Sequence, residues 1–133
     1  MVGYPSFIAQ AANRVDDVAD AAKGATTAMQ RGIANEAKTL DYLGETKNTK
    51  SFTVTLDNGT VKTTIPDFNN ATTIGEIKDV KHLSNTSQIR AEAKAATESG
   101  KNFVIYTGPK TQPSNSVKQL YDLKFLDWLG PQK

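Results

Sequence analysis

The chain has 133 residues, of which 38% are hydrophobic and 23% charged, proportions typical of one soluble globular domain with its own core. It contains no cysteine and a single histidine, His82, which excludes a disulfide framework, a zinc–thiolate site, a cysteine nucleophile and a multi-histidine metal site. The net charge of +2 permits a polyanionic partner without requiring one, and no apolar run approaches the roughly 18 residues that span a bilayer.

The first 25 residues differ in composition from the rest. They are rich in alanine, their apolar residues recur at helical spacing, and Gly24 is placed to end such a helix. We therefore expect a helical leader or linker over residues 1–25 and a single folded domain over residues 26–133.

A second helix is predicted over residues 27–43, ending at Gly44. Its apolar stripe consists of Met29, Ile33, Ala37, Leu40 and Leu43. Glu36 lies three residues after Ile33 and four before Leu40, so it belongs to the inward-facing stripe. A carboxylate there needs a partner. It either forms a salt bridge at the edge of the core or reaches a metal site as a third acid.

Strands dominate the middle of the chain. Residues 51–67 alternate in polarity around an Asn-Gly turn and predict a hairpin, and residues 73–81 predict a third strand. A helix over residues 85–99, a buried strand over residues 103–106 and a last helix from Ser114 to Trp128 follow. The order is helix, three antiparallel-leaning strands, helix, strand, helix. This predicts a mixed α/β (α+β) fold, with a central four-stranded mixed sheet flanked by helices.

Asp67, Glu76 and Lys78 form the pattern with the clearest chemistry. In a strand, Glu76 and Lys78 point to the same side about 6–7 Å apart. Asp67 shares its parity with Val61, Thr63 and Ile65, so we expect it to end an inward-facing row of side chains. Charged groups on an otherwise apolar face are costly unless they pair or bind a metal. Two carboxylates suit a hard cation, with Mg²⁺ the first choice, and the lysine can orient water or stabilise a phosphate. The alternative is a surface hairpin with ordinary charges.

These residues resemble the motif of the PD-(D/E)xK nuclease superfamily, which has the restriction-endonuclease-like fold. The resemblance is closer to toxin domains with this fold at the C-termini of bacterial polymorphic toxins, including contact-dependent growth inhibition toxins. It covers roughly residues 31–107. The supporting residues are Gly32, Asn35, Glu36, Leu40, Leu43-Gly44, Ile65-Pro66-Asp67, Gly75-Glu76-Ile77-Lys78-Asp79-Val80-Lys81, Leu83-Ser84, Thr86, Gln88-Ile89-Arg90 and Ser99-Gly100.

The resemblance implies a metal-dependent endonuclease that cleaves DNA or transfer RNA. It implies secretion as the C-terminal part of a larger toxin, action in the cytoplasm of a target cell, and neutralisation by a cognate immunity protein in the producer. The implied cofactor is a divalent metal, Mg²⁺ first, with Mn²⁺ or Zn²⁺ as alternatives.

The resemblance also implies roles for individual residues. Asp67 and Glu76 bind the metal together with the Ile77 carbonyl. Lys78 positions water or stabilises the transition state, and Glu36 is the acid that the first helix adds.

Four further residues are candidates for substrate binding. The resemblance implies that Gln88 and Arg90 touch the scissile phosphate, although Arg90 could instead form a surface ion pair with Glu92 or Glu98. Lys81 and His82 could line the surface that binds the nucleic acid, although a solvated charge and a solvated strand end are the ordinary roles of such residues.

Two other functions fit the same residues. One is a housekeeping nuclease for repair or recombination. The other is a non-catalytic module that keeps the fold for binding nucleic acid or protein. Metal-dependent degradation of a nucleic acid separates an enzyme from the binding module, and a neighbouring gene for a small inhibitor separates a toxin from the housekeeping nuclease.

Overall fold

The computed structural model describes residues 25–132. The chain divides into two compact units, Met1–Thr46 and Lys47–Lys133. The leader predicted over residues 1–25 lies outside the described residues except for Ala25. No helix in the described part of the chain combines the length and the apolar character needed to cross a membrane.

The described part of the first unit is helix α2, Ala25–Leu43. It ends as predicted at Gly44, whose positive φ of 71° suits a residue without a side chain. The expected stripe is buried only toward its C-terminal end. Ala37 and Leu40 are buried, whereas Met29 and Ile33 are 57% and 37% exposed.

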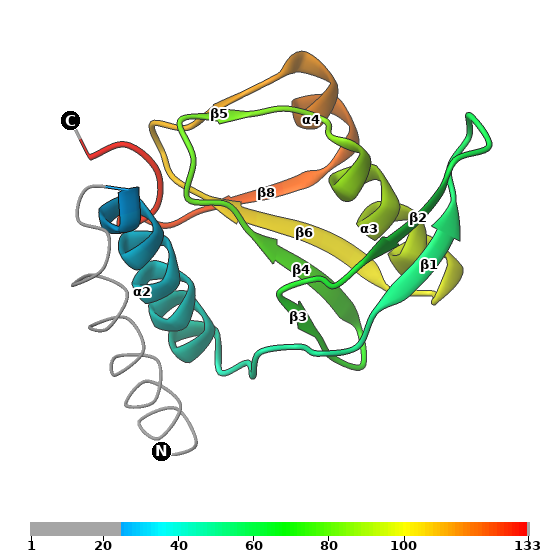
Figure 1. The fold of residues 1–133 in the computed structure, drawn as a ribbon, viewed down its shortest axis with the longest axis horizontal. Coiled ribbons are helices and arrows are strands. Elements are labelled where there is room, and N and C mark those ends of the chain that lie inside the picture. The colour runs from blue at the N-terminus through cyan, green and yellow to red at the C-terminus, as the bar shows by residue number, and fades with distance from the viewer. Residues whose placement is uncertain (1–24, 133) are drawn as a thin grey trace. The chain divides into compact units, whose positions relative to one another are not determined.

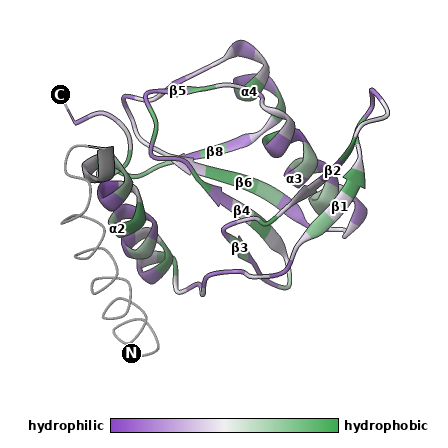
Figure 2. Ribbon diagram, viewed as in Figure 1, coloured by the Kyte–Doolittle hydropathy of each residue, from purple (hydrophilic) through white to green (hydrophobic). Residues whose placement is uncertain are grey.

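The second unit contains the predicted four-stranded mixed sheet (Figure 1). Its order is β3 (Phe68–Asn69), β4 (Thr73–Ile77), β6 (Asn102–Thr107) and β8 (Asp122–Phe125). Strand β3 pairs antiparallel with β4, while β4 pairs with β6 and β6 with β8 in parallel. The central strand β6 is markedly apolar (Figure 2), and Ile105 is fully buried in it. This matches the prediction of a strand covered on both faces.

The predicted hairpin exists, but the expectation that it joins the central sheet is wrong. Strands β1 (Phe52–Thr55) and β2 (Val61–Thr64) form a sheet of their own. Helix α3 (Ser87–Glu98) contacts this hairpin as well as β4 and β6 (Figure 1). Its small side chains Ala91 and Ala95 pack in one core cluster with Val54 of the hairpin and Ile74 of the sheet. The narrow alanine face lets both sheets approach the same helix.

The last predicted helix is also wrong in extent. Helix α4 covers only Asn115–Leu120, capped by Ser114, and the chain then forms β8. Strand β8 continues the ladder of β6, so the backbone groups of that strand are paired on both sides. Two short segments, β5 (His82–Leu83) and β7 (Gln112–Pro113), form a separate parallel pair.

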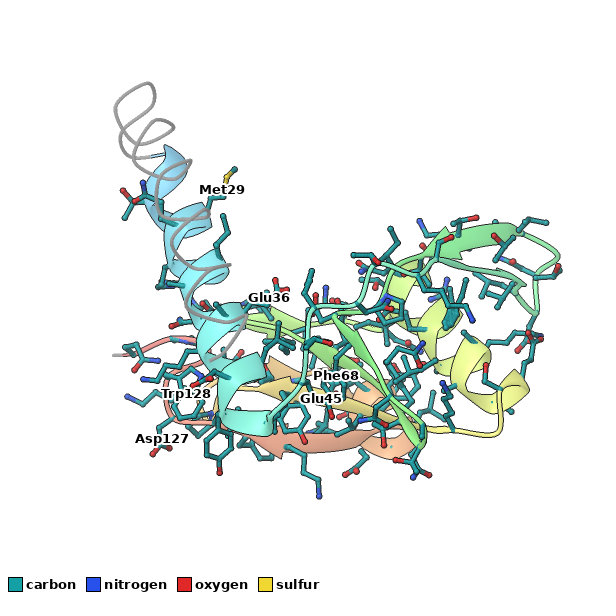
Figure 3. The ribbon with its side chains drawn as sticks, turned by 90° about the horizontal axis from the view of Figure 1, so that it is seen from below. Met29, Glu36, Glu45, Phe68, Asp127 and Trp128 are labelled. Carbon is teal, nitrogen blue, oxygen red and sulfur yellow. The ribbon has the colours of Figure 1, made fainter. Side chains whose placement is uncertain are left out.

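Phe68 and Gly75 face each other across β3 and β4. The Phe68 ring, labelled in Figure 3, is buried and lies 6.1 Å from the Tyr106 ring, measured between centroids. A β-carbon on Gly75 would collide with the Phe68 ring. Because Asp67 precedes Phe68 and Glu76 follows Gly75, this contact also sets the distance between the two acids.

Gly75→Ala should therefore destabilise the protein by about 1–3 kcal/mol, the usual cost of overpacking a core. Urea denaturation of both proteins measures the change. Gly32→Ala is the matched control, because a β-carbon there meets nothing within 4 Å. On a helix, that change should be neutral or stabilising by up to about 1 kcal/mol. Equal stabilities of the wild type and Gly75→Ala would contradict the assigned packing.

Candidate active site

Asp67 follows Pro66 immediately before β3, and its side chain is held from two sides. Its Oδ2 accepts a hydrogen bond from the Ile77 backbone N–H at 2.7 Å, and its Oδ1 lies 3.0 Å from Lys47 Nζ. Its own backbone N–H donates to Glu76 Oε1 at 3.3 Å. The structure thus brings Asp67 and Glu76 together, with the Asp67 backbone hydrogen-bonded to the Glu76 side chain.

The strand alternation predicted for residues 61–67 is wrong, so it does not explain the orientation of Asp67. Its supposed parity partners Val61 and Ile65 are 65% and 50% exposed, whereas Thr64, of opposite parity, is buried. Strand β2 ends at Thr64, and Pro66 cannot continue a hydrogen-bonded ladder. Asp67 lies between β2 and β3, so the alternation of β2 does not carry through to it.

Glu76 lies in β4 and is only 3% exposed. Its Oε2 forms an ion pair with Lys78 Nζ at 3.3 Å and accepts a hydrogen bond from Gln88 Nε2 at 3.3 Å. Lys78 directly follows β4, and its backbone is fixed by β6: its N–H donates to the Tyr106 carbonyl at 2.8 Å. Glu76 and Lys78 do lie on the same side, as the alternation predicts.

Gln88, in the first turn of α3, is also brought to the acids. Its Nε2 donates to Glu76 Oε2 and to Glu92 Oε2, both at 3.3 Å. Helix α3 begins here because the Thr86 side chain accepts from the Ile89 backbone N–H, a standard N-terminal cap.

Glu92 is an acid that the sequence analysis did not assign to the site. It is fully buried, one helical turn after Gln88, and its Oε2 also accepts from Thr64 Oγ1 at 2.6 Å. It lies three residues after Ile89 and four before Ala96, both buried. This spacing is the same sequence signal that places Glu36 on the inward-facing stripe of its helix.

The surroundings of Glu76 and Glu92 disfavour the charged forms of these two acids. Burial, with Asp67 and Glu92 nearby, raises the pKa of Glu76 to about 9, and Lys78 opposes this increase. Burial also raises the pKa of Glu92, against the hydrogen bond from Thr64. Perturbed carboxylates of this kind gather at functional sites more often than elsewhere.

The other predicted substrate-binding residues lie on the surface. Lys81, His82 and Arg90 are exposed. The Arg90 guanidinium donates to the Asn85 carbonyl, and it does not pair with Glu92, whose buried carboxylate is held by Thr64 and Gln88. Since Arg90 is two residues from Gln88 on the helix, their side chains do not share a face.

The predicted roles of Glu36 and Ile77 stay predictions. Glu36 lies on α2 in the first unit and is partly exposed. Ile77 ends β4, and its backbone N–H serves Asp67.

The donor set of Asp67 and Glu76 fits a hard divalent cation. Both are buried carboxylates, and carboxylate oxygens are the ligands that Mg²⁺ and Mn²⁺ prefer. Within residues 25–132, no group of three or more histidine, cysteine, aspartate or glutamate side chains is arranged to hold a metal ion. A cation here would therefore depend on two carboxylates, with backbone carbonyls or water completing its shell.

Comparison with known proteins identifies the family of the chain. No curated protein and no solved structure matches the chain significantly. The family model for restriction endonuclease fold toxin 7 matches residues 32–117, well over half of the chain, and that range includes all the acids described above. The mixed sheet, the Asp67–Glu76–Lys78 cluster and this match agree, and the chain belongs to the restriction endonuclease fold toxin 7 family.

Proposed function

We propose that this protein is a metal-dependent endonuclease toxin that hydrolyses phosphodiester bonds in nucleic acid. One observation carries the proposal: Asp67, Glu76 and Lys78 converge in a buried cluster with Gln88, in a chain of a restriction endonuclease fold toxin family. The toxin family match disfavours a housekeeping nuclease, and the buried acid pair beside Lys78 disfavours a non-catalytic binding module.

Each residue has a distinct task in this proposal. Asp67 and Glu76, with the Ile77 carbonyl, would hold the cation, with Mg²⁺ first and Mn²⁺ or Zn²⁺ as alternatives. A bound divalent cation supplies Lewis-acid stabilisation of charge on the phosphate. Lys78 keeps its ammonium group beside Glu76, where it can orient the attacking water or stabilise negative charge in the transition state. Glu36 is proposed as a further acid of the site.

Substrate contact is assigned to the surface around these acids. Gln88 is proposed to touch the scissile phosphate, while Lys81, His82 and Arg90 are proposed to bind the flanking backbone through charge and hydrogen bonds. We favour structured RNA, transfer RNA first, over DNA because a small domain offers little surface for a long duplex.

The proposed partner is a small immunity protein that silences the toxin in its producer. It would present acidic residues to the basic substrate-binding surface. Delivery as the C-terminal part of a larger secreted toxin and action in the target-cell cytoplasm belong to the same proposal.

Incubating the purified chain with total transfer RNA and, separately, with supercoiled plasmid tests the activity and the substrate together. We expect cleavage of transfer RNA in Mg²⁺ or Mn²⁺ and none in excess EDTA. Plasmid nicking with intact transfer RNA would reverse the choice of substrate. Cleavage that persists in EDTA would contradict the metal dependence, and no cleavage of either substrate with any of the three metals would favour the binding module.

A further inference from the structure

Glu92 is a buried acid that the proposed mechanism does not use. It is fully buried on α3, and its carboxylate has two unlike oxygens. Oε2 accepts from the Thr64 hydroxyl and the Gln88 amide, whereas Oε1 is buried without a hydrogen-bond partner in the described part of the chain. Burying a carboxylate oxygen without a hydrogen-bond partner costs free energy, which indicates that Glu92 has a function beyond packing.

The charges around Glu92 are unbalanced. The two lysines of the site pair with the other two acids: Lys47 with Asp67 and Lys78 with Glu76. No basic side chain among residues 25–132 pairs with Glu92. Cation binding draws carboxylates into their ionised forms, and with all three acids ionised the cluster keeps one negative charge in excess of its lysines, which favours the cation.

Glu92 also fixes Gln88. A single nitrogen, Gln88 Nε2, reaches both Glu92 Oε2 and Glu76 Oε2, so the two carboxylates together set the orientation of the amide. The Glu92 end of this bridge is anchored by the 2.6 Å hydrogen bond from Thr64 Oγ1. The bridge connects α3 and the hairpin to the carboxylate that the proposed cation site depends on.

We propose that Glu92 is a positioning residue of the cation site, which adds negative charge behind Glu76 and holds the Gln88 amide against it. This inference rests on the proposed function. Among residues 25–132 no three acids are grouped so that they could hold a metal ion, so the proposal places Glu92 behind the ligands and not among them. It acts on cation affinity through its charge and through Gln88, as residues behind metal ligands do elsewhere.

The test measures Mn²⁺ affinity by calorimetry on the substrate-free protein at one pH, with melting of the cation-free protein recorded in parallel. Glu92→Gln keeps the size of the side chain and removes its charge, so it should weaken Mn²⁺ binding about tenfold. Melting of the cation-free protein should be unchanged or higher, because a buried charge is lost. Glu92→Asp keeps the charge and should retain more of the affinity than Glu92→Gln.

Glu98→Gln is the matched control, because it removes the same charge from an exposed position on the same helix and should bind Mn²⁺ like the wild type. Wild-type affinity in Glu92→Gln, together with lost binding in Asp67→Asn, would make Glu92 purely structural and leave the proposed function standing. No Mn²⁺ binding by the wild type would overturn both the cation site and the role of Glu92.

Discussion

Replacing Asp67, Glu76 or Lys78 by alanine should abolish nucleic-acid cleavage while the protein stays folded. Asp67 and Glu76 would lose the carboxylates proposed to hold the cation. Lys78→Ala removes the ammonium group that lies 3.3 Å from Glu76 Oε2. The loss of one such group in a preorganised site costs at least about a hundredfold in rate. Cleavage rates at saturating Mg²⁺, with circular dichroism to confirm folding, give the measurement.

Two comparisons sharpen this prediction. Lys81→Ala removes the same charge from an exposed residue three positions later, and it should reduce cleavage far less than Lys78→Ala. Glu36→Gln, which keeps the volume and removes the charge, should reduce cleavage about tenfold if this acid serves the site. Full activity in folded Glu76→Ala would contradict the assignment of the site, whereas full activity in Glu36→Gln alone would leave a site of Asp67, Glu76 and Lys78.

The architecture could be predicted where local signals and packing agree. The Asn-Gly turn of the hairpin, the end of α2 at Gly44 and the two-sided burial of β6 all depend on short stretches of sequence. The mixed four-stranded sheet was predicted, but only two of its strands, β4 and β6, were among the predicted strands.

The C-terminal segment could not be predicted in the same way. The spacing of Tyr121, Phe125 and Trp128 suits a helix, yet residues 122–125 form β8. Phe125 is 53% exposed, so it does not belong to the buried apolar face that the helix prediction assumed. Residues 122–125 form a strand because they pair with the edge of β6. Strand β6 is about 20 residues away in the sequence, so local periodicity carries no information about this pairing.

Contacts within one segment of the site could be predicted from the sequence, whereas contacts between distant segments could not. Glu76 and Lys78 lie on one continuous segment, so simple alternation predicts their contact. The contact of Thr64 with Glu92 joins the hairpin to α3 across 28 residues, and only the tertiary packing brings them together. Lys47 was missed for the same reason, because its partner Asp67 is 20 residues further along the chain.

Glu76→Gln should make the cation-free protein more stable at pH 8, even though it removes activity. The pKa of Glu76 is raised to about 9 in the folded protein, whereas its ordinary value is 4.5. Between these values the folded state binds more protons than the unfolded state, so stability falls as pH rises. This single group can lower the free energy of unfolding by up to about 1.4 kcal/mol per pH unit in that window. Glutamine cannot ionise and escapes this loss.

Urea denaturation in EDTA at pH 5.5 and pH 8 tests the linkage. The stability difference between Glu76→Gln and the wild type should grow with pH, while exposed Glu98→Gln should follow the wild type at both values. Adding Mn²⁺ at pH 8 should restore stability to the wild type but not to Glu76→Gln, because cation binding requires the ionised carboxylate. Parallel curves for the wild type and Glu76→Gln would mean that Glu76 ionises in the folded protein as easily as in the unfolded chain.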